Sequence, residues 1–312
     1  MKQTIGVPGF FVVGAPRCGT TALCRYLMRN PQICFSRPKE THYFAQNSEV
    51  PSASQLKTDY IDRYFSHCNA SNRLAGEGSV SYLYLPGIIE RIRHINPQAK
   101  FIALVRNPLT MLPSYHLRMQ YLLQEDEPDF ARAWGLQEAR ARGEHMPRRC
   151  LDGRALMYGE VARFGAQIEH LFNVAGRDHA HVIVFDDFMA DASAAYRGAL
   201  RFLQLDDDGQ THFEPRYESQ LYRYRWLQQL FFLPVARGGK KMDTVQRRKR
   251  KYNPDGSKKK DWIKRLTDWN KVPTAPRPLT SEMRAVVSDY LRADIELLSR
   301  LLQRDLGFWL AD

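Results

Sequence analysis

A glycine-bounded loop between an apolar run and a helical pattern constrains the fold of this chain more than any other feature. Residues 9–14 are apolar and rich in aromatic and β-branched side chains, which predicts a short buried strand. Residues 20–29 carry apolar side chains at helical spacing. The loop between them, residues 14–21, spaces two glycines by four residues and ends in two threonines. A strand, a loop and a helix in this order aim backbone N–H groups at a phosphate, so we predict a phosphate-binding loop.

Further strands and helices alternate along the rest of the chain. The same reading of apolar runs and helical periodicity predicts strands at residues 33–36, 74–77, 101–105 and 182–185 and helices at residues 60–65, 86–95, 109–123, 158–172, 194–203 and 281–302. Alternation of this kind indicates βαβ units. We therefore predict a single α/β domain over residues 1–312, with a central, mostly parallel sheet flanked by helices and a phosphate-loop nucleotide-binding architecture.

The cation of the loop stands in an unusual place. The loop that binds nucleoside triphosphates has a lysine between its second glycine and its final hydroxyl residue. Thr20 occupies that position here, and the loop carries Arg17 instead. This difference disfavours one alternative function, that of an ATP-dependent small-molecule kinase. It suits a single phosphate group that Arg17 approaches from the side.

The positive charge of the chain is concentrated in one segment. The 312 residues have a formal net charge of +12, and residues 237–265 hold 13 Lys and Arg against three acids, which is +10 of that total. Glycine, proline and serine in this segment indicate a loop. Three roles stay open for it: a solvated loop, a flap that binds an anion, or an arm that binds nucleic acid.

Two motifs resemble the sulfotransferases that use 3′-phosphoadenosine 5′-phosphosulfate (PAPS). Residues 16–21, Pro-Arg-Cys-Gly-Thr-Thr, are similar to the 5′-phosphosulfate loop of that family. Residues 105–108, Val-Arg-Asn-Pro, followed by a serine, are similar to its 3′-phosphate site. The resemblance covers about the first 120 residues and continues more weakly beyond them. It implies that the nucleotide is bound by Arg17, Cys18, Gly19, Thr20, Thr21, Arg106 and Ser114.

The catalytic candidates lie in residues 38–44, Pro-Lys-Glu-Thr-His-Tyr-Phe. The segment resembles the one that supplies the base in carbohydrate-modifying, heparan-sulfate-type sulfotransferases. By that match Glu40 removes the proton of the acceptor, which attacks sulfur in line, and His42 is the second candidate for the base. Arg17 and Lys39 are then expected to stabilise the departing 5′-phosphate.

Residues 77–78, Glu-Gly, mark a departure from that family. The heparan-type enzymes have Glu-Lys at this place, so Gly78 argues against a polysaccharide acceptor. We expect a hydroxyl-bearing small molecule, lipid or sugar as the acceptor, with an amine as a further option. The products would be a sulfate ester and 3′-phosphoadenosine 5′-phosphate (PAP).

The resemblance also gives the basic segment a role. Family members close a late loop rich in Lys and Arg over the nucleotide, and residues 247–251 and 256–260 lie in the corresponding region. We expect one of these strings to cover the nucleotide and the other to face the acceptor. The alternative from another class is a protein that binds nucleic acid or another anionic polymer through residues 237–265, without enzyme activity.

The remaining residue types lead to expected absences. The five cysteines are odd in number and show no CxxC pair, so we expect neither a disulfide framework nor a zinc site, and a reducing cytoplasm as the location. No metal is expected in the reaction. No run of 18 apolar residues occurs, so we expect no transmembrane segment. Nucleic acid is not expected as a partner of the enzyme.

Overall fold

The computed structural model describes residues 6–47, 49–68, 74–213, 219–231 and 261–310. The chain divides into two compact units. The sheet unit comprises Met1–Met111, Ala162–Arg216 and Ala285–Asp312, and the second unit comprises Leu112–Val161 and Tyr217–Arg284. Neither unit is one continuous segment. The prediction of a single domain with bounds 1–312 stays a prediction.

The sheet unit is built on five parallel strands: β1 (Phe10–Gly14), β2 (Ile33–Phe35), β3 (Leu74–Glu77), β4 (Lys100–Val105) and β5 (Ala180–Val184). Their order in the sheet is β2-β3-β1-β4-β5, and every neighbouring pair is parallel. The predicted α/β fold with a mostly parallel central sheet is therefore confirmed. Every residue of β1 is buried, as expected for a strand covered by helices on both faces.

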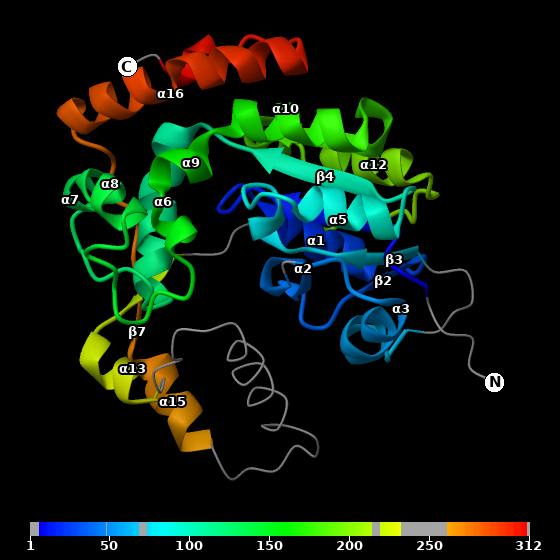
Figure 1. The fold of residues 1–312 in the computed structure, drawn as a ribbon, viewed down its shortest axis with the longest axis horizontal. Coiled ribbons are helices and arrows are strands. Elements are labelled where there is room, and N and C mark those ends of the chain that lie inside the picture. Colours follow the sequence, from blue (N-terminus) through cyan, green and yellow to red (C-terminus); the bar gives the residue numbers. More distant parts are fainter. Residues whose placement is uncertain (1–5, 48, 69–73, 214–218, 232–260, 311–312) are drawn as a thin grey trace. The chain divides into compact units, whose positions relative to one another are not determined.

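Helices cover both faces of this sheet. The helices that lie wholly within the sheet unit are α1 (Thr20–Arg29), α2 (Tyr43–Gln46), α3 (Ala53–Gln55), η1 (Leu56–Ile61), α4 (Asp62–Tyr64), η2 (Val80–Tyr82), α5 (Ile88–Ile95), α10 (Phe164–Ala175), η4 (Arg177–His179), α11 (Phe185–Ala190), α12 (Ala192–Leu203) and η5 (Gly307–Trp309). The helix α5 packs on α10, and α1 packs on α12. The connection from β1 to β2 and the connection from β3 to β4 run in opposite directions across the sheet. If both are right-handed, as is the rule, the helices α1 and α12 cover one face and the helices α5 and α10 cover the other (Figure 1).

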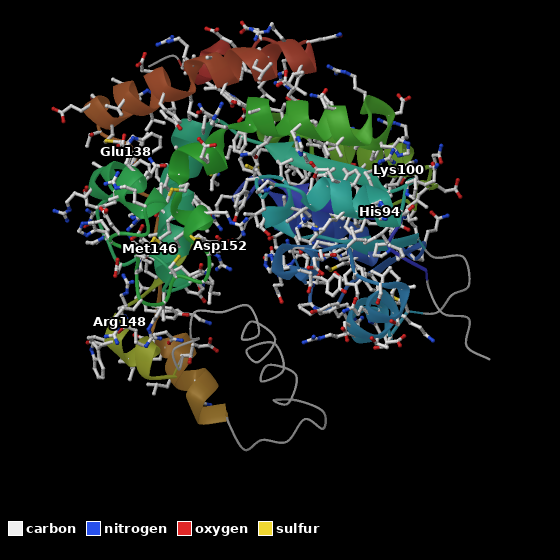
Figure 2. All side chains as sticks on the ribbon, viewed as in Figure 1. His94, Lys100, Glu138, Met146, Arg148 and Asp152 are labelled. Carbon is white, nitrogen blue, oxygen red and sulfur yellow. A yellow bond between two sulfur atoms is a disulfide. The ribbon has the colours of Figure 1, made fainter. Side chains whose placement is uncertain are left out.

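The second unit is mostly helical and contains a small antiparallel sheet that the sequence did not predict. Its elements are α7 (Phe130–Gly135), α8 (Gln137–Ala141), η3 (Gly153–Leu156), β6 (Gln220–Tyr222), α13 (Arg225–Phe231), α15 (Asp261–Trp269) and β7 (Lys271–Pro273). Three helices have residues in both units: α6 (Pro108–Tyr121), α9 (Tyr158–Ala162) and α16 (Ser281–Leu302). Figure 2 labels four side chains of this unit: Glu138, Met146, Arg148 and Asp152.

A buried ion pair lies in the second unit. The guanidinium of Arg140 donates to both carboxylate oxygens of Glu125, at 2.7 and 2.8 Å, and both side chains are fully buried. The hydroxyl of Tyr158 donates to the same carboxylate, at 2.7 Å. Burial opposes the charge of Glu125, but the hydrogen bonds from Arg140 and Tyr158 outweigh it and lower the pKa of this carboxyl group.

The predicted helix at residues 158–172 is wrong in one respect, because it is broken at Arg163. There the backbone leaves the helical region, and α10 starts anew at Phe164. Asp294 on α16 accepts hydrogen bonds from the backbone of Gly165 (2.7 Å) and Ala166 (2.9 Å). The start of α10 is thus satisfied by a residue more than a hundred positions away, which local periodicity cannot reveal.

The predicted helix at residues 60–65 also differs from the structure. Residues 56–61 form the π-helical segment η1, and only Asp62–Tyr64 are α-helical. The strands at 33–36, 74–77, 101–105 and 182–185 and the helices at 86–95, 109–123, 194–203 and 281–302 are all confirmed, with ends that differ by at most two residues.

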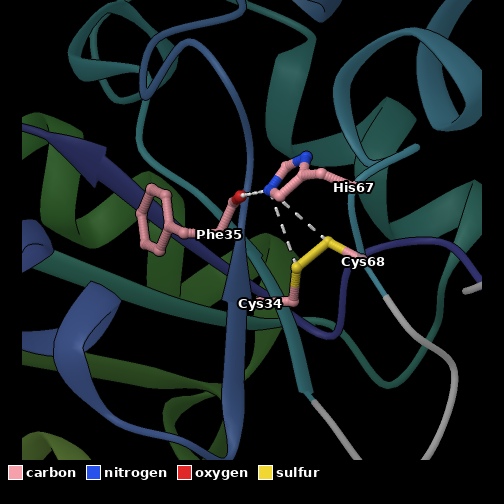
Figure 3. Close-up of a disulfide and its surroundings, with 4 residues drawn as sticks. All are labelled: Cys34, Phe35, His67 and Cys68. Carbon is pink, nitrogen blue, oxygen red and sulfur yellow. Dashed lines mark hydrogen bonds between the residues drawn. A yellow bond between two sulfur atoms is a disulfide. The ribbon is translucent and has the colours of Figure 1, made fainter.

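A disulfide joins Cys34 and Cys68, so the expectation of unpaired cysteines is wrong for this pair (Figure 3). Cys34 lies in β2 and Cys68 follows α4, 34 residues later, with their Cα atoms 5.9 Å apart. The chain leaves the sheet after β2 and returns to its edge through α2, α3, η1 and α4. Residue spacing alone does not show that return. The disulfide also removes one ground for expecting a reducing cytoplasm.

The ring of His67 lies beside this disulfide. Its Nε2 atom is 3.1 Å from the carbonyl oxygen of Phe35 and 3.8 Å from the sulfur of each cysteine (Figure 3). Burial and the charge of Arg37 lower the pKa of His67. The two sulfurs are bonded to each other, so this group of potential metal ligands is a disulfide site in the structure.

No helix in the described ranges has the length and apolarity needed to cross a membrane. The basic segment, residues 237–265, lies outside the described residues up to position 260. Its last five residues open α15. The roles predicted for residues 247–251 and 256–260 therefore stay predictions.

Candidate active site

The carboxyl ends of the five parallel strands meet at one edge of the sheet, and the predicted site residues of the sheet unit follow these ends. The predicted loop follows β1, Lys39 and Glu40 follow β2, and Arg106 follows β4. Ligands bind at this edge in open α/β sheets. The opposite edge carries structural contacts, such as the hydrogen bond from Lys100, labelled in Figure 2, to the carbonyl of Phe202; this bond is 2.7 Å long.

The backbone of the loop after β1, where the phosphate site is predicted, takes up left-handed conformations at two residues. Arg17 and Gly19 both have positive φ angles, 62° and 90°. Gly19 caps α1, and a Cβ atom on it would lie 3.1 Å from the ring of Phe188, so glycine suits both the conformation and the space. The first turn of α1 has no acidic side chain that would repel an anion.

The other three predicted ligands in the loop, Cys18, Thr20 and Thr21, differ in exposure. Cys18 and Thr20 are buried, and Thr21 is exposed. Burial raises the pKa of the Cys18 thiol well above its usual value, so it stays protonated. Its backbone N–H donates to the carbonyl of Ala15 (3.4 Å), and its thiol donates to the carbonyl of Pro16 (3.4 Å), so both groups of Cys18 stabilise the loop itself.

Arg106 is oriented by contacts with the loop after β1, with α6 and with the first residue of α11. Its Nη1 donates to the main-chain carbonyl of Arg17 (3.4 Å), and its Nε donates to Thr110 Oγ1 (3.1 Å). Its guanidinium carbon lies 4.6 Å from the centre of the Phe185 ring, which follows β5. Phe185 was not among the predicted site residues, although it is the last residue of the strand predicted at 182–185.

The C-terminal end of the sheet unit also reaches this edge. The side chain of Asn107 donates to the carbonyl of Trp309 (3.2 Å), and the indole of Trp309 donates to Asp186 (3.0 Å). Trp309 is buried, so it fixes the segment after β4 to the segment after β5. Ser114, the second predicted 3′-phosphate ligand, is buried on α6 and belongs to the second unit.

Lys39, Glu40 and His42 form a cluster of charged and polar side chains. Lys39 Nζ lies 2.7 Å from one carboxylate oxygen of Glu40, and His42 Nε2 lies 3.4 Å from the other. The other ring nitrogen of His42 is 3.1 Å from the hydroxyl of Ser81. The structure thus brings together three of the four predicted catalytic residues, and Ser81 is a partner that the sequence did not single out.

The cluster sets the charge of its members. Burial opposes the ionised form of Glu40, but the hydrogen bond from His42 and the charge of Lys39 outweigh it and lower the pKa of Glu40 to about 2. Burial likewise opposes the charge of Lys39, and Cys24, Glu40 and Glu77 outweigh it and raise the pKa of Lys39. At neutral pH the pair is therefore a carboxylate and an ammonium.

Cys24 connects this cluster to the phosphate loop. It lies on α1, the helix that the loop opens, and it interacts electrostatically with Lys39 and Glu40. A Cβ atom on Gly78 would lie 2.8 Å from the sulfur of Cys24 and 3.3 Å from the ring of Phe35. A side chain at position 78 would therefore require Cys24 to shift.

Comparisons with known proteins support the resemblance. No family model matches the chain. It is 32% identical over 123 residues to the membrane-associated sulfotransferase kil1 of Dictyostelium discoideum, a match that covers 39% of this chain and 25% of that protein. It is 26% identical over 163 residues to the bifunctional heparan sulfate N-deacetylase/N-sulfotransferase 3 of Mus musculus, which covers 50% of this chain and 18% of that protein.

The chain thus matches a quarter or less of the length of these two relatives. Among solved structures, the sulfotransferase from Alicyclobacillus acidocaldarius is similar with a TM-score of 0.63 and 22% identity, over 98% of this chain and 99% of that one. The resemblance to the sulfotransferase family that the motifs indicate is therefore confirmed in sequence, and the fold is that of a sulfotransferase.

Proposed function

We propose that the chain transfers a sulfuryl group from PAPS to a hydroxyl or amine acceptor. The observation that carries this proposal is the hydrogen bond from Arg106 to the main-chain carbonyl of Arg17. It joins the motif that resembles a 5′-phosphate site to the motif that resembles a 3′-phosphate site. A nucleotide with phosphate groups at both ends of its ribose needs two anion sites at a fixed separation. Arg106 supplies that link.

The loop suits PAPS better than ATP. Thr20, at the position of the triphosphate lysine, is 3% exposed and offers no cation. In this proposal the N–H groups of the loop and Arg17 bind the 5′-phosphate. Arg106 binds the 3′-phosphate, where a guanidinium makes a paired contact with two oxygens. Ser114 stays a predicted ligand of that phosphate.

Glu40 is the proposed general base. The proton of the acceptor hydroxyl moves to the Glu40 carboxylate while the acceptor oxygen forms a bond to sulfur. The bond between sulfur and the bridging oxygen of the 5′-phosphate breaks, and its electron pair stays on that oxygen. PAP leaves with a charge that Arg17 and Lys39 stabilise, as positioned cations do in phosphoryl transfer.

The pKa of Glu40 is about 2 in the protein without a bound donor, where Lys39 lies beside the carboxylate. A base that weak accepts a proton poorly. His42 and Lys39 both lower this pKa; when the negatively charged donor binds, it competes for Lys39, and the carboxylate loses one of these two partners. Donor binding would thereby strengthen the base at the moment it is needed.

The acceptor is proposed as a small molecule, lipid or sugar with a free hydroxyl group. The packing around Gly78 supports the departure from polysaccharide enzymes. An amine acceptor belongs in the test because the mouse relative is named an N-sulfotransferase. Nucleic acid is not proposed as a partner, and residues 237–265 are proposed to cover the nucleotide and face the acceptor. A cytoplasmic location stays a prediction, which the redox state of Cys34 and Cys68 in protein isolated from cells would test.

Thermal unfolding with PAP, ATP and DNA tests the donor. A ligand at 100 times its dissociation constant stabilises the folded state by about 2.7 kcal/mol. We expect PAP to stabilise the protein and ATP to have little effect. Stabilisation by ATP alone would favour the kinase, and a salt-sensitive effect of DNA without any effect of PAP would favour the polymer-binding protein.

Turnover with labelled PAPS and a panel of acceptors tests the base. We expect Glu40→Gln to lower kcat by about 10²–10⁴-fold while stabilisation by PAP is kept. His42→Ala is the matched comparison, because His42 contacts the same carboxylate. If Glu40→Gln keeps near wild-type turnover and His42→Ala abolishes it, His42 is the base instead.

A further inference from the structure

The carboxylate of Glu77 is fully buried and accepts hydrogen bonds from three hydroxyl groups. Thr41 Oγ1 donates to Glu77 Oε1 at 2.7 Å, and Ser79 Oγ donates to the same oxygen. The hydroxyl of Tyr60 donates to Oε2. In the described part of the chain, all hydrogen-bond partners of this carboxylate are hydroxyl groups. A buried carboxylate without a bonded cation is costly, so its role should lie in what it holds in place.

The two residues after Glu77 continue the same contact. The N–H of Gly78 donates to the carbonyl of Lys39 (3.2 Å), and Ser79 Oγ accepts from the N–H of His42 (3.0 Å). The end of β3 therefore holds the backbone before Glu40 and the backbone after it. Glu40 itself stays 33% exposed, on a segment that is fixed on both sides.

We propose that Glu77 is a positioning residue. It acts through Thr41 and Ser79 to hold the base, Glu40, in place. This proposal rests on the proposed function of Glu40 in sulfuryl transfer. Thr41 directly follows Glu40, and its hydroxyl also accepts from the N–H of Tyr43 (3.1 Å) at the start of α2. Loss of the carboxylate would leave two hydroxyl groups and this turn without a common anchor.

Loss of the Glu77 carboxylate should lower the rate of catalysis, because the base must meet the acceptor in a narrow range of positions. A misplacement of about 1 Å costs on the order of 100-fold in rate. The pKa of Lys39 supports the same assignment, since the Glu77 carboxylate is one of the charges that raise it. Neither effect requires contact between Glu77 and a substrate.

Steady-state kinetics with PAPS tests the proposal in three single variants and in the double variant Thr41→Val/Glu77→Gln. Glu77→Ala should lower kcat by about 100-fold, and Glu77→Gln, which keeps an acceptor oxygen for Thr41, by about tenfold. Stabilisation by PAP and the KM for PAPS should stay within about threefold of wild type. Thr41→Val should reproduce the Glu77→Gln loss, and the double variant should lose little more, because both changes break one connection.

Two readouts separate positioning from mere structural support. The acid limb of kcat/KM should move to higher pH in Glu77→Gln, since a loosened cluster no longer depresses the pKa of Glu40. Amide hydrogen exchange of residues 39–44 should become faster, while β1 and β4 keep their protection. If Glu77→Ala does not fold, the Glu77→Gln and Thr41→Val variants carry both readouts.

Asp294→Asn is the matched control, because Asp294 is a buried carboxylate that holds the start of α10. It should lower the unfolding temperature without changing kcat or the pH profile. An active wild type whose Glu77→Gln variant keeps its kcat, its pH profile and its exchange rates overturns the role of Glu77 alone. A wild type without turnover on any acceptor overturns the proposed function, and the role of Glu77 with it.

Discussion

The side chain of Arg106 donates to the main-chain carbonyl of Arg17 across 3.4 Å, although 89 residues separate them in the sequence. The contact exists because β1 and β4 are neighbours in the sheet and their carboxyl ends lie at the same edge. In the proposed site, a guanidinium held in this way would meet the 3′-phosphate already oriented, which lowers the conformational cost of binding.

Replacement of Arg106 should weaken PAP binding more than the loss of charge alone explains. Hydrogen bonds to charged groups contribute about 1.5–3 kcal/mol, so Arg106→Ala should raise the Kd for PAP by about 10–100-fold. Arg106→Lys should raise the Kd for PAP less than Arg106→Ala does but still above the wild-type value, because an ammonium keeps the charge and cannot make the paired contact. Titration calorimetry measures both. Arg197→Ala, which removes an exposed ion pair with Asp207, should leave PAP binding unchanged. Equal Kd values for all three variants would contradict the assignment.

The low pKa of Glu40 should appear in the pH dependence of stability. The folded state holds this pKa at about 2, below the ordinary value of 4.5, so the ionised form stabilises the fold above pH 4.5. That contribution is lost progressively as the pH falls from 4.5 toward 2. Urea unfolding of wild type and Glu40→Gln should therefore show a difference that is constant from pH 7 to 5 and shrinks below. A difference that grows on acidification would contradict the sign.

Reduction of the Cys34–Cys68 disulfide should destabilise the fold. The two cysteines are 34 residues apart, and closing a loop of that length in the unfolded chain corresponds to about 3–4 kcal/mol in the chain-entropy treatment. Urea unfolding with and without a dithiol reductant measures the change. The double variant Cys34→Ser/Cys68→Ser should match the reduced protein and show no further response to reductant. Cys150→Ser, at a free cysteine, should keep the response. Identical midpoints for oxidised and reduced wild type would argue against the disulfide.

The buried pair of Arg140 and Glu125 should be far more costly to break than to replace. Arg140→Ala leaves a buried carboxylate without its cation, so we expect a loss of about 3–5 kcal/mol in unfolding free energy. The double variant Arg140→Met/Glu125→Leu removes both charges and should lose much less. Denaturant unfolding of the single and double variants gives the coupling energy. A double variant as unstable as the sum of the single variants would show that the two side chains do not act as a pair.

Prediction from the sequence was most successful where a pattern reflects contiguous residues. The strands β1 and β4 read as continuous apolar runs because both faces of a parallel sheet are covered, and α16 was predicted with the bounds observed. The short strands β6 and β7 have three residues each, too few for a periodic pattern, and were missed. The break at Arg163 was missed because its cause, Asp294, lies on a distant helix.

Some residues of the candidate site could likewise be identified from the sequence, and others could not. The sequence pointed to Arg17, Glu40 and Arg106 because each occurs in a short motif directly after an expected strand. It left the role of Glu77 open and did not single out Ser81. Both make side-chain contacts with residues 41–42, which lie more than 30 positions earlier.

The sequence by itself determined the glycine-bounded loop between β1 and α1, the run of strands and the residue types that the proposed sulfuryl transfer would use. These depend on the conformational preferences of neighbouring residues, which a short segment carries with it. Only the tertiary structure decided that Arg106 contacts the loop, that Glu77 holds the segment around Glu40 and that Cys34 meets Cys68. Those contacts depend on the strand order, in which β3 lies between β2 and β1, and local patterns do not encode the order in which strands assemble.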